Sequence, residues 1–135
     1  MDRAELLCSL GQTVMISNFQ EYYKLVEYFS EFTKARIGLA MGVSSFIQIF
    51  DEKYYRNLSG GILEAFGKLF FKDLKVYLYP LKDQRSGEIR TSENLKVHPR
   101  MKELYKFFKY NGKVVDIKDY NPDILDVFSK TILDM

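Results

Sequence analysis

Short clusters of glycine, serine and charged residues follow the apolar runs of this chain, and these clusters could do chemistry. The clearest cluster is Gly42-Val43-Ser44-Ser45, where glycine ends an apolar run and serine can begin a helix. Backbone N–H groups at such a turn can bind a phosphate. A plain strand-to-helix turn with a serine cap is the favoured alternative, because no Gly-x-Gly-x-x-Gly and no Walker A lysine accompanies the cluster.

Three further clusters could bind a ligand. Ser17 and Asn18 follow an earlier apolar run. Ser59-Gly60-Gly61 offers three successive N–H groups to an anion, or forms a flexible helix start. Lys82 and Asp83 open a polar stretch that could close over an acidic substrate, or that could be an ordinary surface loop. The expected ligand-binding residues are therefore Ser17, Asn18, Gly42, Ser44, Ser45, Ser59, Gly60, Gly61, Lys82 and Asp83.

The composition excludes several kinds of chemistry. Cys8 is the only cysteine and His98 the only histidine. A disulfide within the chain and a thiolate metal cluster are therefore excluded. A zinc site or a Ser–His–Asp triad could be built only on His98. We expect no metal, and the residue types identify neither a cofactor nor catalytic residues.

Charge and hydropathy argue against nucleic acid and membrane as partners. The net charge is +2, and lysine and arginine are scattered among nearly as many acidic residues. Nucleic-acid binders usually concentrate positive charge on one face. No segment reaches the roughly 18 apolar residues that span a membrane, and the charged start 1–5 lacks the apolar core of a signal peptide. We expect a single cytoplasmic α/β domain over residues 1–135.

Hydrophobic periodicity predicts alternating helices and strands. Strands are expected over 13–17, 36–43, 74–79 and 113–117, and helices over 2–10, 19–34, 46–55, 62–71, 99–110 and from 121 onward. The runs at 13–17 and 36–43 are almost continuously apolar, which favours strands covered on both faces, with 36–43 central. Strand 74–79 alternates, which favours either a position nearer an edge or a strand that is covered on only one face. Residues 83–87 are expected at a hairpin tip or in an exposed loop.

This order of elements predicts an α/β fold: an open, mostly parallel, three-layer sheet with helices on both faces. Ligands bind beyond the carboxyl ends of the strands in such sheets. That rule nominates residues 17–18, 42–45 and 79–83. The chain opens on a helix instead of a strand, which leaves open whether it is the C-terminal part of a larger Rossmann-like protein.

Several segments also resemble a known bacterial family. They are Ile16-Ser17-Asn18-Phe19, Glu21-Tyr22-Tyr23, Phe32-Thr33-Lys34, Gly38-Leu39-Ala40-Met41-Gly42-Val43, Ile49-Phe50-Asp51-Glu52-Lys53-Tyr54-Tyr55, Gly60-Gly61-Ile62-Leu63-Glu64-Ala65-Phe66-Gly67-Lys68-Leu69-Phe70 and Val76-Tyr77-Leu78-Tyr79-Pro80. Members are often labelled nicotinate-nucleotide (nicotinic acid mononucleotide) adenylyltransferases, and some TonB-dependent receptors. The resemblance covers most of the chain and implies that it forms the C-terminal region of a longer protein.

Three functions follow as hypotheses. The first is a domain that binds a nucleotide or phosphorylated metabolite at the strand ends. The second, implied by the resemblance, is the catalytic part of a nicotinate-nucleotide adenylyltransferase-like enzyme. The third is an association module whose tyrosine- and phenylalanine-rich surface packs on an upstream domain or on a second copy of the chain.

Overall fold

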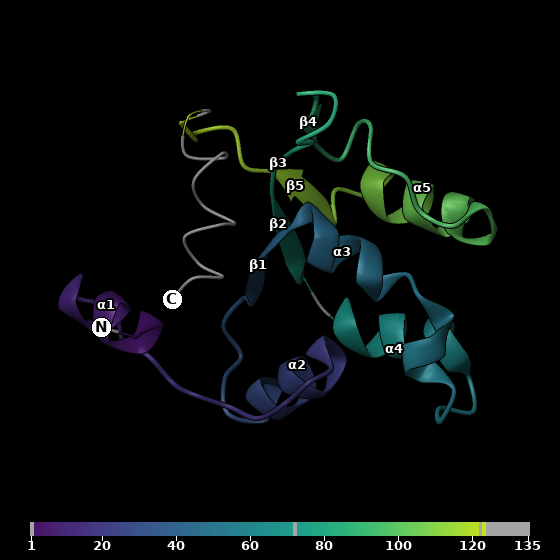
Figure 1. The fold of residues 1–135 in the computed structure, drawn as a ribbon. Coiled ribbons are helices and arrows are strands. Elements are labelled where there is room, and N and C mark those ends of the chain that lie inside the picture. The colour runs from purple at the N-terminus through teal and green to yellow at the C-terminus, as the bar shows by residue number, and fades with distance from the viewer. Residues whose placement is uncertain (1, 72, 122, 124–135) are drawn as a thin grey trace.

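The protein is a mixed α/β structure built on a small parallel sheet (Figure 1). The computed structural model describes residues 2–71, 73–121 and 123. Its sheet holds β1 (Gly38–Gly42), β2 (Lys75–Tyr79) and β5 (Val114–Asp116) in the order β1-β2-β5, with both pairs parallel. A separate antiparallel pair, β3 (Leu81–Lys82) with β4 (Ile89–Arg90), follows β2 directly.

Helices precede β1 and occupy the connections between the parallel strands. They are α1 (Arg3–Ser9), α2 (Tyr22–Ser30), α3 (Val43–Ile49), α4 (Gly61–Leu69) and α5 (Lys102–Tyr110), with short 3-10 helices η1 (Glu52–Tyr55) and η2 (Pro99–Met101). Helices α3 and α4 connect β1 to β2, and α5 lies between β2 and β5. The strand order advances in one direction, so right-handed crossovers place both connections on one face of the sheet.

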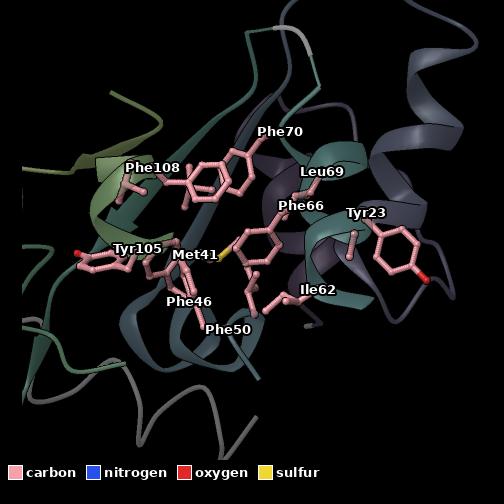
Figure 2. Packing of buried hydrophobic residues seen from close by; sticks show 14 of the residues in the cluster. Tyr23, Met41, Phe46, Phe50, Ile62, Phe66, Leu69, Phe70, Tyr105 and Phe108 are labelled. Carbon is pink, nitrogen blue, oxygen red and sulfur yellow. The ribbon is translucent and has the colours of Figure 1, made fainter. Parts of the chain in front are cut away.

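The core lies between that face and the helices (Figure 2). Val76 and Leu78 of β2 are fully buried. The ring of Phe46 on α3 lies 6.0 Å from the ring of Tyr105 on α5, and the ring of Phe66 on α4 lies 5.2 Å from that of Phe108 on α5. Helices from both crossovers thus meet over the same side of the sheet.

One expectation about the sheet is wrong among the described strands, because β1 was expected at the centre and lies at an edge. For β2 the sequence left two alternatives, a position nearer an edge or cover on one face only. β2 lies at the centre with alternating burial, so the second alternative is the one observed. The described residues therefore support an α/β fold with parallel strands, and a helical layer on the second face remains a prediction.

The predicted strand 13–17 does not form. These residues have no regular secondary structure and pair with no strand in the described part of the chain, and Ile16 is 83% exposed. Apolar periodicity reports a tendency to be buried, and a strand forms only where a neighbour offers hydrogen bonds. Helix α2 also begins later than the expected residue 19, with Glu21 at its N-cap.

The remaining boundaries agree with the sequence at some positions and differ from it at others. Asp2 caps α1 through a hydrogen bond from the Glu5 backbone N–H to its carboxylate, 2.8 Å long. Helix α3 begins earlier than expected because Gly42, not a serine, is its N-cap, and the predicted helix 46–55 is split into α3 and η1. The hairpin at 83–87 is confirmed. The last predicted helix, from 121 onward, lies largely outside the described residues.

Candidate functional site

A groove lies at the carboxyl ends of β1 and β2, where the chain enters α3 and the β3–β4 hairpin. It encloses about 440 Å³. The groove, here called the carboxyl-edge groove, is lined by Val43, Ile47, Leu81, Lys82, Asp83, Gln84, Arg90, Leu95 and Lys96. In parallel α/β sheets this edge is where ligands bind.

The lining divides into an apolar and a charged part. Val43 and Leu95 are buried, and Ile47 and Leu81 are half-buried. The hairpin and the segment after it contribute the polar residues Lys82, Asp83, Gln84, Arg90 and Lys96. The charged lining residues are three cations and one carboxylate, and a second carboxylate, that of Glu88, contacts Arg90. An apolar wall facing a few charged groups is the usual composition of a small-molecule site.

Asp83 organises the tip of the hairpin. Its carboxylate accepts hydrogen bonds from the backbone N–H groups of Arg85, at 2.8 Å, and Ser86, at 3.4 Å. Its own N–H donates to the Glu88 carbonyl at 2.8 Å, and Gly87 turns the chain with φ +73°. The Arg85 and Ser86 N–H groups, followed by Arg90, hold the pKa of the Asp83 carboxyl below 3.8. Asp83 is therefore an ionised structural residue of the groove wall.

Arg90 lies between two carboxylates. Its Nη2 is 3.5 Å from Asp83 Oδ2 and 3.6 Å from Glu88 Oε2, and its Nη1 donates to the Asn94 carbonyl at 3.3 Å. These contacts fix the half-buried guanidinium across the hairpin. Lys96, by contrast, forms no ion pair within the described residues and is exposed at the groove.

The pH response of the hairpin follows from Asp83. Because its folded-state pKa is depressed, the ionised carboxylate stabilises the hairpin at every pH above its ordinary value of 3.8, and this stabilisation is lost as the pH falls through the lower folded value. We expect the amide NMR signals of Arg85 and Ser86 to be constant from pH 7 to 5 and to shift only below 3.8. Asp83→Asn is expected to abolish that transition. A midpoint at or above 3.8 contradicts the assignment.

A buried hydrogen-bond cluster holds the segment behind the groove. Ser92 is buried, and its N–H and Oγ donate to the two oxygens of Asp116 at the end of β5, at 2.9 and 2.5 Å. The Tyr105 hydroxyl donates to the Ser92 carbonyl. Burial, then the Asp116 charge, raises the pKa of Tyr105 to about 12, so its hydroxyl stays protonated and keeps donating. The cluster fixes Leu95 and Lys96 relative to the sheet.

The structure brings together some of the residues expected from sequence. Lys82 and Asp83 line the carboxyl-edge groove, and Gly42 ends β1 immediately before its lining residue Val43. Ser44 is exposed and Ser45 half-buried on α3, and Ser45 lines a different cavity, of about 180 Å³, with Gln48 and residues of η1 and 20–22.

The other expected residues lie elsewhere. Ser17 and Asn18 are exposed in the irregular segment before α2 and end no described strand, so the reasoning that nominated them is wrong. Ser59, Gly60 and Gly61 begin α4, where the Ser59 hydroxyl is 3.5 Å from the Glu64 carboxylate. The negative charge of Glu64 beside this helix start would repel a bound anion.

Sequence reasoning missed the apolar wall and the most exposed cation. Ile47 lies on the expected buried side of the predicted helix 46–55, and Leu81 and Leu95 stand in stretches without a clear apolar pattern, so none of the three suggests a ligand site. Lys96 sits in a short stretch without periodicity. The parallel topology could have indicated part of the groove, because residues that follow β1 and β2 must meet at one edge of the sheet. No local sequence pattern predicts that residues 95–96 fold back to that edge.

Comparisons with protein-family models, with curated proteins and with solved structures give no match for this chain. Among residues 2–71, 73–121 and 123, no group of three or more His, Cys, Asp or Glu side chains forms a metal site. His98 accepts a hydrogen bond from the Arg100 N–H at 3.2 Å and so caps η2. No described helix has the length and apolar character needed to cross a membrane.

Proposed function

We propose that this domain binds a nucleotide or another phosphorylated small molecule in the carboxyl-edge groove. The observation that carries the proposal is the pairing, in one groove at the strand ends, of an apolar wall with three cationic side chains. A phosphate suits Lys82 and Lys96, and a base or other flat apolar group suits Ile47 and Leu95. The Gln84 amide supplies an acceptor and a donor for hydroxyl or amino groups.

The proposed ligand site agrees with the type of protein that the sequence predicts. The domain would be part of a cytoplasmic bacterial protein with an open, three-layer, Rossmann-like sheet, and the groove would be its ligand edge. The isolated groove is too small and too locally charged for a nucleic-acid footprint, which needs several phosphate contacts along one face. A single phosphorylated molecule of nucleotide size is the ligand class that its chemistry favours.

Isothermal titration calorimetry tests the proposal with ATP, AMP, nicotinate mononucleotide, ribose 5-phosphate and adenosine. We expect saturable binding of at least one phosphorylated compound and weaker binding of adenosine. Lys82→Gln and Lys96→Gln should each weaken that binding about tenfold or more, because a charge-assisted contact contributes roughly 1.5–3 kcal/mol. Adding ATP and nicotinate mononucleotide together and measuring pyrophosphate release tests the adenylyltransferase alternative.

Lys34→Gln is the matched control. Lys34 is exposed and precedes β1, at the opposite end of the sheet from the groove. Its variant should bind as the wild type does. The absence of binding for every phosphorylated compound, or equal losses in the groove and control variants, contradicts the proposal.

Self-association is a second candidate, favoured by the amino-terminal segment. Helix α1 buries none of its side chains, and Leu6, Leu7, Leu10 and Ile16 are all exposed. Exposed apolar surface of this kind is typical of an interface with another domain or a second copy. Analytical ultracentrifugation decides: a mass that rises with concentration and that Leu7→Asp returns to a monomer supports this role, and a monomer at all concentrations opposes it.

A further inference from the structure

One edge of the parallel sheet is open. In the strand order β1-β2-β5, β1 lies at one end, and β2 is the only described strand that pairs with it (Figure 1). Gly38, Ala40 and Gly42 of β1 are exposed. The unpaired N–H and C=O groups of an edge strand are a template on which another strand can pair.

The hydrogen bonds of β2 show how its backbone is directed. The Val76 N–H donates to the Lys113 carbonyl, and the Leu78 carbonyl accepts from the Ile117 N–H, both at 2.9 Å. Val76 and Leu78 therefore direct their backbone groups toward β5. Since this direction alternates from one residue of a strand to the next, Tyr77 directs its own groups toward β1.

The strand register then identifies the outward groups of β1. Tyr77 lies beside Ala40 in the register. In a parallel pair, a residue bonds to the two residues that flank its partner, which here are Leu39 and Met41. The backbone groups of the alternate residues face the open edge, and these residues are Gly38, Ala40 and Gly42.

The residues of β1 are symmetric about Ala40. The strand Gly38-Leu39-Ala40-Met41-Gly42 presents glycine, a large apolar residue, alanine, a large apolar residue and glycine in either direction. A two-fold interface needs a surface that is complementary to itself. Two antiparallel copies of β1 with the axis at Ala40 place alanine opposite alanine, glycine opposite glycine and Leu39 opposite the partner's Met41.

This arrangement also matches the bonding groups. Residues that lie opposite each other at alternate positions of an antiparallel pair exchange two hydrogen bonds. The Ala40 N–H and C=O would bond to those of the partner's Ala40, and the Gly42 N–H would donate to the carbonyl of the partner's Gly38. Leu39 is half-buried against the core, and the partner's Met41 would extend its apolar contacts across the axis.

β1 lacks the features that protect an edge strand from pairing. Edge strands are usually kept apart by charged side chains, proline, a bulge or a very short length. β1 contains neither a charged residue nor proline, and its register with β2 is continuous from Gly38 to Gly42. β5, at the other end of the sheet, covers only Val114–Asp116 and includes a charged residue. Strand pairing is therefore favoured at β1.

We propose that two copies of the chain pair through the outer edges of their β1 strands, antiparallel and with Ala40 on the two-fold axis. The two sheets then form one continuous sheet. This inference rests on self-association, the second candidate function, and assigns to it a surface separate from α1. The assembly stops at a dimer, because each copy has only one such edge among its described strands.

Charge changes at the axis test the proposal by analytical ultracentrifugation of the full chain. We expect the wild-type mass to rise with concentration and to stop at a dimer. Ala40→Lys and Ala40→Glu should each weaken the dimer about threefold or more, because like charges directly opposite each other repel. An equimolar mixture of the two variants should associate more tightly than either alone. Ala35→Lys, at an exposed alanine before β1, is the matched control and should associate as the wild type does.

Ala40→Pro tests the backbone bonds at the same position. The Ala40 N–H faces the open edge, so proline removes no bond between β1 and β2 and is tolerated in an edge strand of this kind. We expect the variant to keep the wild-type circular dichroism spectrum. Its dimer should be about tenfold weaker or more, because each copy loses an N–H donor at the axis.

The outcomes separate this interface from self-association in general. A wild type that stays monomeric at every concentration overturns both. A dimer that the Ala40 variants weaken no more than Ala35→Lys overturns the β1 interface alone, and so does a mixture that associates no more tightly than its components. A dimer that Leu7→Asp dissociates and the Ala40 variants leave intact assigns the association to α1 instead. If Ala40→Pro unfolds, the charge variants still decide.

Discussion

Replacing Phe66 with alanine is expected to lower the free energy of unfolding by about 3–5 kcal/mol, the usual cost of removing a buried phenylalanine. Phe66 is 2% exposed and lies at the centre of the aromatic core (Figure 2). Its ring centroid is 5.0 Å from that of Phe50 and 5.2 Å from that of Phe108. Phe66 therefore connects α4 to α3 and α5. Its removal leaves a cavity where these three helices meet, and no single helix can move to fill it.

Urea unfolding followed by circular dichroism measures this effect. Phe107→Ala is the control, because Phe107 is 61% exposed and neighbours the buried Phe108. It should change stability by no more than about 0.5 kcal/mol. If Phe66→Ala does not fold, Phe66→Leu should still cost about 1 kcal/mol. A loss below about 1 kcal/mol for a folded Phe66→Ala variant would place the core elsewhere.

Replacing Asp116 with alanine is the second large effect. The Ser92 N–H and hydroxyl would both lose their acceptor while buried. An unpaired buried donor costs about 1–3 kcal/mol, so we expect the protein to lose roughly 2 kcal/mol or more. Asp116→Asn should cost less, because its amide oxygen can still accept one of the two bonds. The pKa of Tyr105 should also fall from about 12, since the Asp116 charge helps to raise it.

The same urea measurement and a spectrophotometric tyrosine titration test both parts. Asp119→Ala is the control, because Asp119 is exposed a few residues further along the chain. A loss of unfolding free energy for Asp116→Ala no greater than that for Asp119→Ala contradicts the stabilising role of the Ser92–Asp116 cluster. Since the cluster holds the segment that carries Leu95 and Lys96, Asp116→Ala is also expected to weaken ligand binding in the groove.

Much of the fold can be predicted from particular residues. Asp2 and Gly11 mark the ends of α1, and Gly112 follows α5 with φ +68°, because caps and left-handed glycines act locally. The alternation in β2 correctly identifies Val76 and Leu78 as core residues. Local signals work wherever the deciding contacts lie within a few residues.

The errors arise where distant contacts decide. The run at 13–17 has the composition of a strand but finds no partner among the described strands. The order β1-β2-β5 depends on which strand the last one joins, and no residue in 36–43 encodes that choice. The candidate site divides in the same way. The parallel topology predicts that Gly42 and Lys82 lie at one edge of the sheet. Lys96 lies at that edge because the Ser92–Asp116 cluster holds its segment there, and these two residues are 24 positions apart in the sequence.

The most direct test of the central claim is a map of backbone amide NMR shifts during titration with the tightest phosphorylated ligand. The proposal predicts that the largest shifts fall on Val43, Ile47, Lys82, Arg90 and Lys96, which line the carboxyl-edge groove. Shifts concentrated around Ser45, Gln48 and Tyr54 would place the ligand in the smaller cavity instead. That result, or a titration with no shifts at all, would contradict a ligand site at the carboxyl ends of β1 and β2.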